Sequence, residues 1–287
     1  MQAMRQRSVR CLSRAGFHDM AYVEWGDPRN PHVLVCVHGL TRCGRDFDFL
    51  AQALAGEYRV VCPDVVGRGR SDWLRDKSLY EMAQYAADMA TLLARLDVDG
   101  VDWLGTSMGG LIGMALAAQE KTPLRRLILN DVGPVITATS VARIGEYVGH
   151  IPRFDSIDEA EAFVRTVAAP FGKLSDVQWR HLTTHVVRVA EDGKVELRYD
   201  PGIAEPFRKA LATEEGRDIE LWPIYDAIRC PTLAIRGALS DLLTPATHAA
   251  MAERGPRAQL AEIDGVGHAP MFMDPAQIEI VRTFLAT

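Results

Sequence analysis

The sequence predicts an α/β fold: a mostly parallel central sheet flanked by helices, with an inserted helical cap. Short runs are apolar at nearly every position, which is typical of strands buried on both faces, as in parallel sheets. Segments between these runs repeat apolar residues every three or four positions, the period of an amphipathic helix. Alternation of the two patterns favours a layered α/β architecture.

The expected strands and helices can be placed along the chain. Strands are expected over residues 32–37, 58–62, 101–104, 124–129, 231–235 and 258–263. A helix is expected over residues 79–96, because its apolar residues share one face. Another is expected to begin after Asp274 as N-cap, with Pro275 at the first helical position and Gln277 completing a capping box.

The strand pattern stops between about residues 133 and 225. Consecutive helices are expected there over residues 140–151, 156–168 and 174–190, and the weak alternation of residues 194–200 is left unassigned. The predicted organisation is a core of residues 1–132 and 226–287 and a helical cap, or lid, of residues 133–225. Such a lid over the strand ends would enclose an apolar pocket and restrict water.

Composition and charge narrow the expected partners. The 287 residues are 48% hydrophobic and carry a formal net charge of -6, which gives no electrostatic reason to expect nucleic acid or an anionic membrane. No apolar stretch is long enough to span a bilayer, and residues 1–14 lack the apolar segment of a signal peptide. The expected partner is a small molecule, and the expected location is the cytoplasm.

Cysteine and histidine spacing gives no metal-site signature. The five cysteines are odd in number and widely spaced, as in reduced cytoplasmic proteins, and no CxxC pair or Cys/His cluster with zinc spacing is present. His181 and His185 lie four residues apart on an expected helix, but no glutamate follows His181 as in the HExxH pattern. They are therefore interpreted as ordinary helix-face residues, and neither a metal nor a cofactor is expected.

The segment LGTSMGG, residues 104–110, follows an expected strand and contains the pattern G-x-S-x-G. This pattern suits a sharp strand-to-helix turn, the nucleophile elbow, because Gly105 and Gly109 leave room where the chain doubles back. Ser107 would then project above the end of the sheet. The same residue types are common in ordinary turns, so Ser107 is a candidate nucleophile only if the chain also supplies its partners.

A serine nucleophile needs a histidine base and usually a carboxylate that orients the histidine. His268 lies in the glycine-rich loop DGVGHAPMFMDP, at the sheet edge where LGTSMGG is also expected, and is the predicted base. The carboxylate is either Asp241 or Asp131, each of which follows an expected strand. Asp241 is preferred because its loop and that of His268 follow neighbouring strands late in the chain. Asp131 would then be a cap or hinge residue at the start of the lid.

The oxyanion that forms during acyl transfer needs amide donors. The N–H of Met108, directly after the nucleophile, is one candidate. The N–H of Leu40 is the other, because it lies in the loop HGLTRCGRD after an expected strand, where Gly39 permits a tight backbone.

With these residues in place, nearly the whole chain resembles the α/β-hydrolase superfamily, of the type with a helical cap. The resemblance rests on VHGL (37–40), PDVVGRGRSD (63–72), GTSMGG (105–110), RGALSDLLTP (236–245) and GVGHAP (265–270), and on the chain order Ser, Asp, His. It implies that residues 63–72 form a structural loop, so that Asp64, Ser71 and Asp72 have no catalytic role.

The resemblance also narrows the reaction. Ser107 differs from the aspartate nucleophile of haloalkane dehalogenases and epoxide hydrolases, and the HGGPG segment of prolyl aminopeptidases is absent. Carbon–carbon bond hydrolases of ring-cleavage (meta-cleavage-type) products often have tryptophan where this chain has Ala269. The prediction is a serine carboxylesterase or lactonase that works through an acyl-enzyme intermediate. The alternatives are a carbon–carbon bond hydrolase and a ligand-binding receptor or scaffold on the same fold.

Candidate pocket residues follow from side-chain type. An apolar acyl or alcohol site could be lined by Met108, Trp179, Trp222, Tyr225 and Met271. Ordinary core packing is the competing explanation for such side chains. Arg42 and Arg45, near the oxyanion loop, could bind a substrate carboxylate or be exposed loop charges. Substrate identity and oligomeric state stay open at this level.

Overall fold

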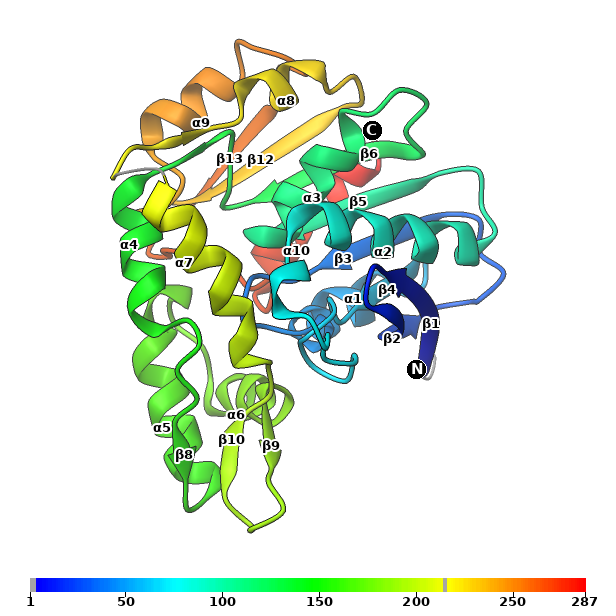
Figure 1. Cartoon of the computed structure of the whole chain (residues 1–287). Helices are drawn as coiled ribbons and strands as arrows, with labels where there is room; N and C mark the ends of the chain where they lie inside the picture. The colour runs from blue at the N-terminus through cyan, green and yellow to red at the C-terminus, as the bar shows by residue number, and fades with distance from the viewer. Residues whose placement is uncertain (1–3, 214–215) are drawn as a thin grey trace.

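The computed structural model describes residues 4–213 and 216–287. Its central sheet consists of β1 (Arg5–Ser13), β2 (Gly16–Trp25), β3 (Val33–Val37), β4 (Arg59–Pro63), β5 (Val101–Thr106), β6 (Leu124–Asn130), β12 (Thr232–Gly237) and β13 (Gln259–Ile263). The strand order is β1-β2-β4-β3-β5-β6-β12-β13. All neighbours from β4 to β13 are parallel, whereas β1 and β2 form an antiparallel hairpin at one edge (Figure 1).

Helices cover both faces of this sheet and bury its two apolar surfaces. One face carries α2 (Met82–Leu96), α3 (Met108–Ala117), α8 (Trp222–Ala227) and α9 (Pro245–Met251); the other carries α1 (Asp48–Leu54) and α10 (Pro275–Leu285). Short 3-10 turns, η1 (Gly44–Phe47) and η2 (Lys77–Leu79), precede α1 and α2. The predicted α/β fold with a mostly parallel sheet is confirmed.

The six expected strands correspond to β3, β4, β5, β6, β12 and β13, with ends shifted by one or two residues. The hairpin of β1 and β2 was not expected from the sequence. Its first strand buries Val9, Cys11 and Ser13 and exposes the residues between them, so it has the alternating pattern of an edge strand rather than a continuous apolar run.

The start of α10 agrees only in part with the expected capping box. Asp274 is the N-cap, and its side chain accepts a hydrogen bond from the Ala276 N–H at 2.7 Å. Gln277, however, accepts from the Phe272 N–H at 2.9 Å, outside the helix. The Gln277 side chain therefore fixes the incoming loop instead of closing the box on Asp274, and that detail of the prediction is wrong.

Most of the chain between β6 and β12, from β7 to β11, lies along one side of the sheet (Figure 1). It contains β7 (Val135–Ile136), α4 (Ala138–Tyr147), β8 (Arg153–Phe154), α5 (Ile157–Val167), η3 (Ala169–Phe171), α6 (Asp176–Val186), β9 (Val187–Val189), β10 (Val195–Leu197), η4 (Pro201–Ile203), α7 (Ala204–Thr213) and β11 (Ile219–Glu220). We call this segment, from β7 to β11, the insertion. Helices α5 and α6 fall within two of the expected helical segments, and α4 overlaps the third but begins two residues earlier, at Ala138.

Residues 187–190, expected to be helical, instead enter a small three-stranded sheet. Helix α6 ends at Val186, and β9 pairs with β10, which in turn pairs with β8. The run of β-branched residues after α6 favours a strand, and Gly193, with φ of 83°, permits the tight turn between β9 and β10. The unassigned segment 194–200 thus contributes the central strand of this sheet.

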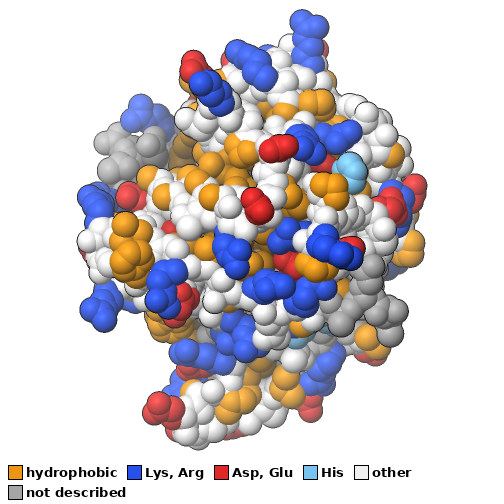
Figure 2. All heavy atoms as spheres, turned by 90° about the vertical axis from the view of Figure 1, so that its right-hand side faces the viewer, with side chains coloured by type: hydrophobic (Ala, Val, Ile, Leu, Met, Phe, Trp, Pro, Cys, Tyr) orange, Lys and Arg blue, Asp and Glu red, His pale blue; other side chains and the backbone are white. Residues whose placement is uncertain are grey.

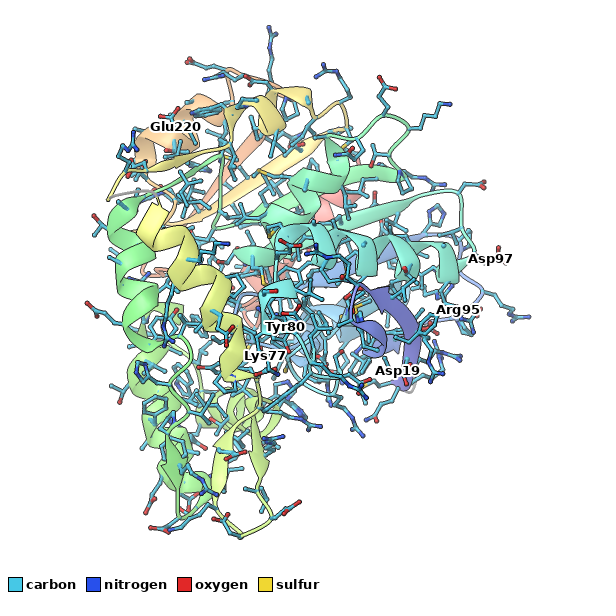
Figure 3. All side chains as sticks on the ribbon, in the orientation of Figure 1. Asp19, Lys77, Tyr80, Arg95, Asp97 and Glu220 are labelled. Carbon is cyan, nitrogen blue, oxygen red and sulfur yellow. The ribbon has the colours of Figure 1, made fainter. Side chains whose placement is uncertain are left out.

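Polar contacts tie the insertion to the core. Tyr80, just before α2, donates a hydrogen bond to Asp200 at 2.6 Å, and Lys77 forms an ion pair with the same carboxylate (Figure 3). Burial raises the pKa of Tyr80 well above its usual value, so the hydroxyl stays protonated and remains a donor.

The surface on the side of the hairpin carries interspersed basic and acidic side chains, with apolar side chains between them (Figure 2). None of the helices in residues 4–213 and 216–287 combines the length and the apolar character needed to cross a bilayer.

Candidate active site

Ser107 occupies the turn between β5 and α3, and its backbone has φ of 51° and ψ of -116°. The two flanking glycines make this turn possible. A Cβ at Gly105 would lie 2.2 Å from the Gly109 carbonyl group, and a Cβ at Gly109 would lie 2.0 Å from the Val37 carbonyl oxygen. Because those neighbours are backbone atoms that cannot move aside, only glycine fits. The sharp strand-to-helix turn expected from G-x-S-x-G is present.

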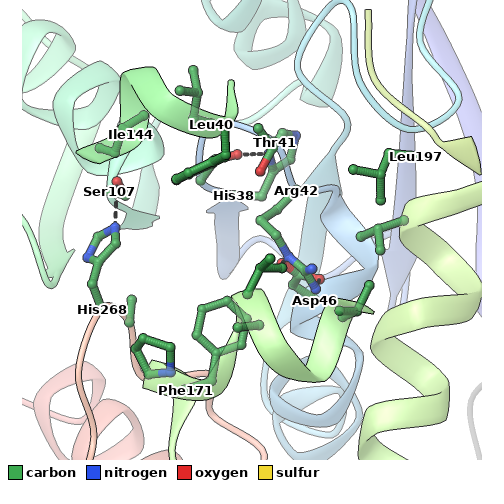
Figure 4. Close-up of a pocket in the computed structure, with 18 of the residues that line it drawn as sticks. His38, Leu40, Thr41, Arg42, Asp46, Ser107, Ile144, Phe171, Leu197 and His268 are labelled. Atoms are coloured by element: carbon green, nitrogen blue, oxygen red, sulfur yellow. Dashed lines mark hydrogen bonds and ion pairs between the residues drawn. The ribbon is translucent and has the colours of Figure 1, made fainter. Parts of the chain in front are cut away.

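His268 links the serine to a carboxylate. Its Nε2 lies 3.0 Å from Ser107 Oγ (Figure 4). Its Nδ1 lies 2.7 Å from Asp131 Oδ2. Because a carboxylate can only accept, the Nδ1 atom carries the hydrogen and donates it to Asp131. The lone pair on Nε2 is then free to accept the Ser107 hydroxyl proton. This is the arrangement of a nucleophile, a base and an orienting acid.

Asp131 is held rigidly at the end of β6. Its side chain is fully buried, its Oδ1 accepts from the Gly237 N–H at 2.9 Å, and its Oδ2 accepts from the Ser240 hydroxyl at 2.6 Å as well as from His268. Three donors on one carboxylate stabilise its negative charge and fix its orientation. Asp131 therefore sets the tautomer and direction of the imidazole.

The prediction that Asp241 orients His268 is wrong. Its carboxylate is 47% exposed and forms a two-pronged ion pair with Arg143, at 2.6 Å to Nε and 3.0 Å to Nη2. His268 contacts Ser107 at the end of β5, and β6 is the strand next to β5 on the side of β12. The residue directly after β6 therefore lies beside the imidazole, and the loop after β12 contributes Ser240 instead of Asp241.

The oxyanion loop lies against the serine. A Cβ at Gly39 would be 3.7 Å from Ser107 Cβ, and the buried Arg68 guanidinium donates to the Leu40 carbonyl oxygen at 2.8 Å, which fixes this loop. In the described part of the chain, the N–H groups of Leu40 and Met108 have no protein acceptor. Both amides are therefore available to a substrate oxygen, as an oxyanion site requires.

Ser107 and His268 open into a cavity of about 570 Å³ whose wall comes from both the core and the insertion. Its apolar lining from the insertion includes Ile144, Ile151, Phe163, Val164, Val167, Phe171 and Leu197. Besides Ser107 and His268, the charged or polar residues described in the wall are His38, Thr41, Arg42, Asp46, Thr106, Arg143, Glu146, Tyr147, His150 and Tyr199. The cavity is therefore mainly apolar, with a few charged positions (Figure 4).

Of the five residues predicted to line an apolar pocket, the structure places one in the cavity wall. Met271 lines the cavity, whereas Met108, Trp179, Trp222 and Tyr225 are not among its described lining residues. Trp179 is buried in a cluster of the insertion, Trp222 stacks on Arg254, and the Tyr225 hydroxyl donates to a backbone carbonyl of α9 at 2.7 Å. For these three aromatic side chains, packing is the observed role.

The two predicted arginines are held in ion pairs. Arg42 lines the cavity, but its guanidinium binds Asp46 through two hydrogen bonds of 2.8 and 2.7 Å and lies over the Phe171 ring. Arg45 pairs with Asp48 outside the described cavity wall. Neither is a free loop cation, because each has a buried carboxylate as partner.

Two clusters of side chains away from the cavity wall have donor atoms close enough to hold a metal ion. They are Asp48, His181 and His185, and Cys11, His18 and Asp88. In the first, both oxygens of Asp48 already accept hydrogen bonds from Arg45. In the second, His18 binds Asp88 directly at 2.9 Å. The chemistry available at Ser107 needs neither cluster.

Known proteins share this architecture and much of the sequence. A family model described as alpha/beta hydrolase fold matches residues 32–275. The 3-hydroxybutyrate-oligomer hydrolase of Cupriavidus necator is 53% identical over 283 residues, which cover 96% of each chain. Lipase LipV of Mycobacterium tuberculosis is 28% identical over 72% of this chain and 75% of its own. An alpha/beta hydrolase from Novosphingobium aromaticivorans superposes with a TM-score of 0.85, at 33% identity, over 100% of this chain and 99% of that one.

Together with the sheet order and the elbow at Ser107, the match of the family over most of the chain confirms the resemblance seen in the sequence. The chain belongs to the α/β-hydrolase family.

Proposed function

We propose that the protein is a serine esterase that hydrolyses short oligoesters of 3-hydroxybutyrate or of closely related hydroxy acids. One observation carries the reaction type: the hydrogen-bonded line of Ser107, His268 and Asp131 opens into a mainly apolar cavity. The substrate class is supported by the 53% identity, over nearly the whole chain, to a 3-hydroxybutyrate-oligomer hydrolase.

The first half of the reaction forms an acyl-enzyme. His268 Nε2 accepts the Ser107 proton as Oγ attacks the ester carbonyl carbon, and Asp131 stabilises the imidazolium that results. The amides of Leu40 and Met108 donate to the oxyanion of the tetrahedral intermediate. His268 then gives the proton to the alkoxide oxygen as the carbon–oxygen bond breaks, which releases a hydroxy-terminated fragment.

The second half uses one water molecule. His268 removes a proton from the water as its oxygen attacks the acyl carbon, and the same proton then returns to Ser107 Oγ as the acyl fragment leaves as a carboxylic acid. The sum is one ester and one water converted into one acid and one alcohol. No electrons are transferred and no metal is required.

The cavity fits a short oligoester better than a highly charged substrate. Its volume of about 570 Å³ is typical of sites for small molecules, and its apolar wall suits a chain of methyl-bearing ester units. The insertion contributes much of this wall, which supports a cap role for residues 133–225. The esterase and lipase relatives favour cleavage of an ester over a carbon–carbon bond or a receptor role.

A cytoplasmic location is part of the same proposal. It is supported by the cysteines, all five of which are buried free thiols, as is common in reducing compartments.

The test is hydrolysis of purified 3-hydroxybutyrate dimer and trimer, with the released acids measured by chromatography. Ser107→Ala, shown to be folded by its thermal unfolding, is expected to lose at least about a thousandfold in kcat. A phosphonate that reacts with serine is expected to label Ser107 in the wild type. Turnover of the oligomers by Ser107→Ala at the wild-type rate would contradict the mechanism, and inert oligomers beside a cleaved ring-cleavage product would contradict the substrate class.

A further inference from the structure

The ion pair between Arg143 and Asp241 joins the insertion to the core at the active-site cavity. Arg143 lies on α4 and lines the same cavity as Ser107, and Asp241 lies in the loop after β12. The side chains are 40% and 47% exposed, respectively. A pair this exposed is worth little in free energy, so a ligand can displace one partner at low cost.

Among its described lining residues, the cavity has two arginines, and one of them is available to a ligand. Arg42 is 14% exposed, and its partner Asp46 is 6% exposed beneath it, so breaking that pair would leave a buried carboxylate without its counter-charge. Asp241, in contrast, would keep contact with water if Arg143 turned away. Arg143 is therefore the cation of the cavity that can change partners.

Arg143 also lies close to the reacting groups. Asp241 directly follows Ser240, whose hydroxyl donates to the catalytic acid Asp131. The next residue of α4 after Arg143 is Ile144, which lines the cavity together with Ser107. A negative group bound by Arg143 would thus lie in the same cavity as the ester that Ser107 attacks.

Resting on the proposed function, we propose that Arg143 binds the free carboxylate at the end of a hydroxy-acid oligoester, with the substrate taking the place of Asp241. The planar guanidinium now bound by two oxygens of Asp241 presents the same geometry to any carboxylate. The terminal hydroxy acid is then the alcohol product, released when the bond from its oxygen to the acyl carbon breaks.

The experiment compares one oligoester in two forms, the 3-hydroxybutyrate dimer as free acid and as methyl ester. The measured quantity is the ratio of kcat/KM for the acid to kcat/KM for the methyl ester. Arg143→Gln is expected to lower this ratio about fivefold, chiefly through KM for the acid, because a partly exposed charge pair is lost. Arg143→Lys, which keeps the charge, should retain most of the ratio.

Asp241→Asn should change the ratio of kcat/KM for the acid to kcat/KM for the methyl ester in the opposite direction. Removing the competing carboxylate should lower KM for the acid, while raising the salt concentration should lower the wild-type ratio. Arg153→Gln is the matched control, since Arg153 pairs with Asp192 on the insertion and is not among the described lining residues. A trimer labelled in its carboxyl-terminal unit should release labelled monomer first.

The outcomes separate the two proposals. If neither form of the dimer is cleaved by the wild type, the proposed function fails. Suppose instead that the methyl ester is cleaved but Arg143→Gln leaves the ratio unchanged, or that Arg143→Gln and Asp241→Asn slow both substrates equally. Either result would mean that the ion pair only holds the insertion against the core. The carboxylate subsite is then overturned, and the esterase stands.

Discussion

Asp131→Asn is expected to remove most of the activity while the fold persists. The Asp131 carboxylate accepts hydrogen bonds from Gly237 N, Ser240 Oγ and His268 Nδ1, at 2.9, 2.6 and 2.7 Å. An asparagine that keeps the Gly237 bond through its oxygen turns its NH2 group toward His268. Because NH2 can only donate, the imidazole must accept at Nδ1 and carry its hydrogen at Nε2, where it can no longer accept the proton of Ser107.

The size of the effect follows from that change of tautomer. Holding the histidine of a serine hydrolase triad in the wrong tautomer lowers kcat by about 10⁴, or roughly 5.5 kcal/mol of activation free energy. The free energy of unfolding should fall by about 1.5–3 kcal/mol, since the hydrogen bonds from Gly237, Ser240 and His268 are no longer made to a charged group. Asp241→Asn makes the same chemical change on an exposed side chain that does not contact His268, and should lower kcat by less than about fivefold.

The assay is kcat on a short chromogenic ester and on the 3-hydroxybutyrate dimer, with urea unfolding of each variant to confirm that it is folded. The reverse order of effects would refute the reasoning. A loss of more than about a hundredfold in Asp241→Asn, beside a loss of less than about tenfold in a folded Asp131→Asn, would show that the loop after β12 carries the acid in solution.

Three further changes have defined outcomes. Gly109→Ala places a Cβ 2.0 Å from the Val37 oxygen and should lower the free energy of unfolding in urea by more than about 3 kcal/mol. Gly56→Ala, whose Cβ would have no atom within 4 Å, should lower it by less than about 1 kcal/mol. Equal losses would contradict the steric argument. Burial lowers the pKa of His38 to about 3, so between that value and about 6.5 the unfolded chain binds the extra proton and stability falls as the pH drops. His38→Gln should remove about 1 kcal/mol of that loss between pH 6 and pH 5 in urea unfolding, and an unchanged slope would argue against a neutral buried imidazole. Ser240→Ala removes a donor to the triad acid and should lower kcat about tenfold with KM nearly constant; a change in KM alone would point to substrate binding instead.

The parallel part of the sheet could be predicted because its strands are buried on both faces and are apolar at almost every position. Cys36 and Leu34 of β3 are as fully buried as Val35 between them, so the strand is apolar without alternation. The hairpin at the sheet edge alternates buried and exposed residues, and in a chain segment rich in arginine that weaker signal was missed.

The positions of Ser107 and His268 could be predicted because each lies in a short motif whose glycines describe the local turn. The choice between Asp131 and Asp241 could not, because it depends on which strand lies beside β5, and that order is a property of the assembled sheet. The residues of the cavity wall could not be predicted from the sequence either. Whether Trp179 or Ile144 faces the site depends on how α6 and α4 are rotated against the core, which side-chain type alone does not reveal.

Ser107, Asp131 and His268 all lie in loops that follow core strands β5, β6 and β13, so the core supplies all three side chains. The insertion touches the His268 loop through its backbone, because the Pro170 carbonyl oxygen accepts a hydrogen bond from the Gly267 N–H at 2.6 Å. Replacing the segment between β6 and β12 with that of another family member should change the cavity wall that selects the substrate, while Ser107, Asp131 and His268 stay in place. Substrate selectivity can therefore be re-engineered within one contiguous segment of the chain.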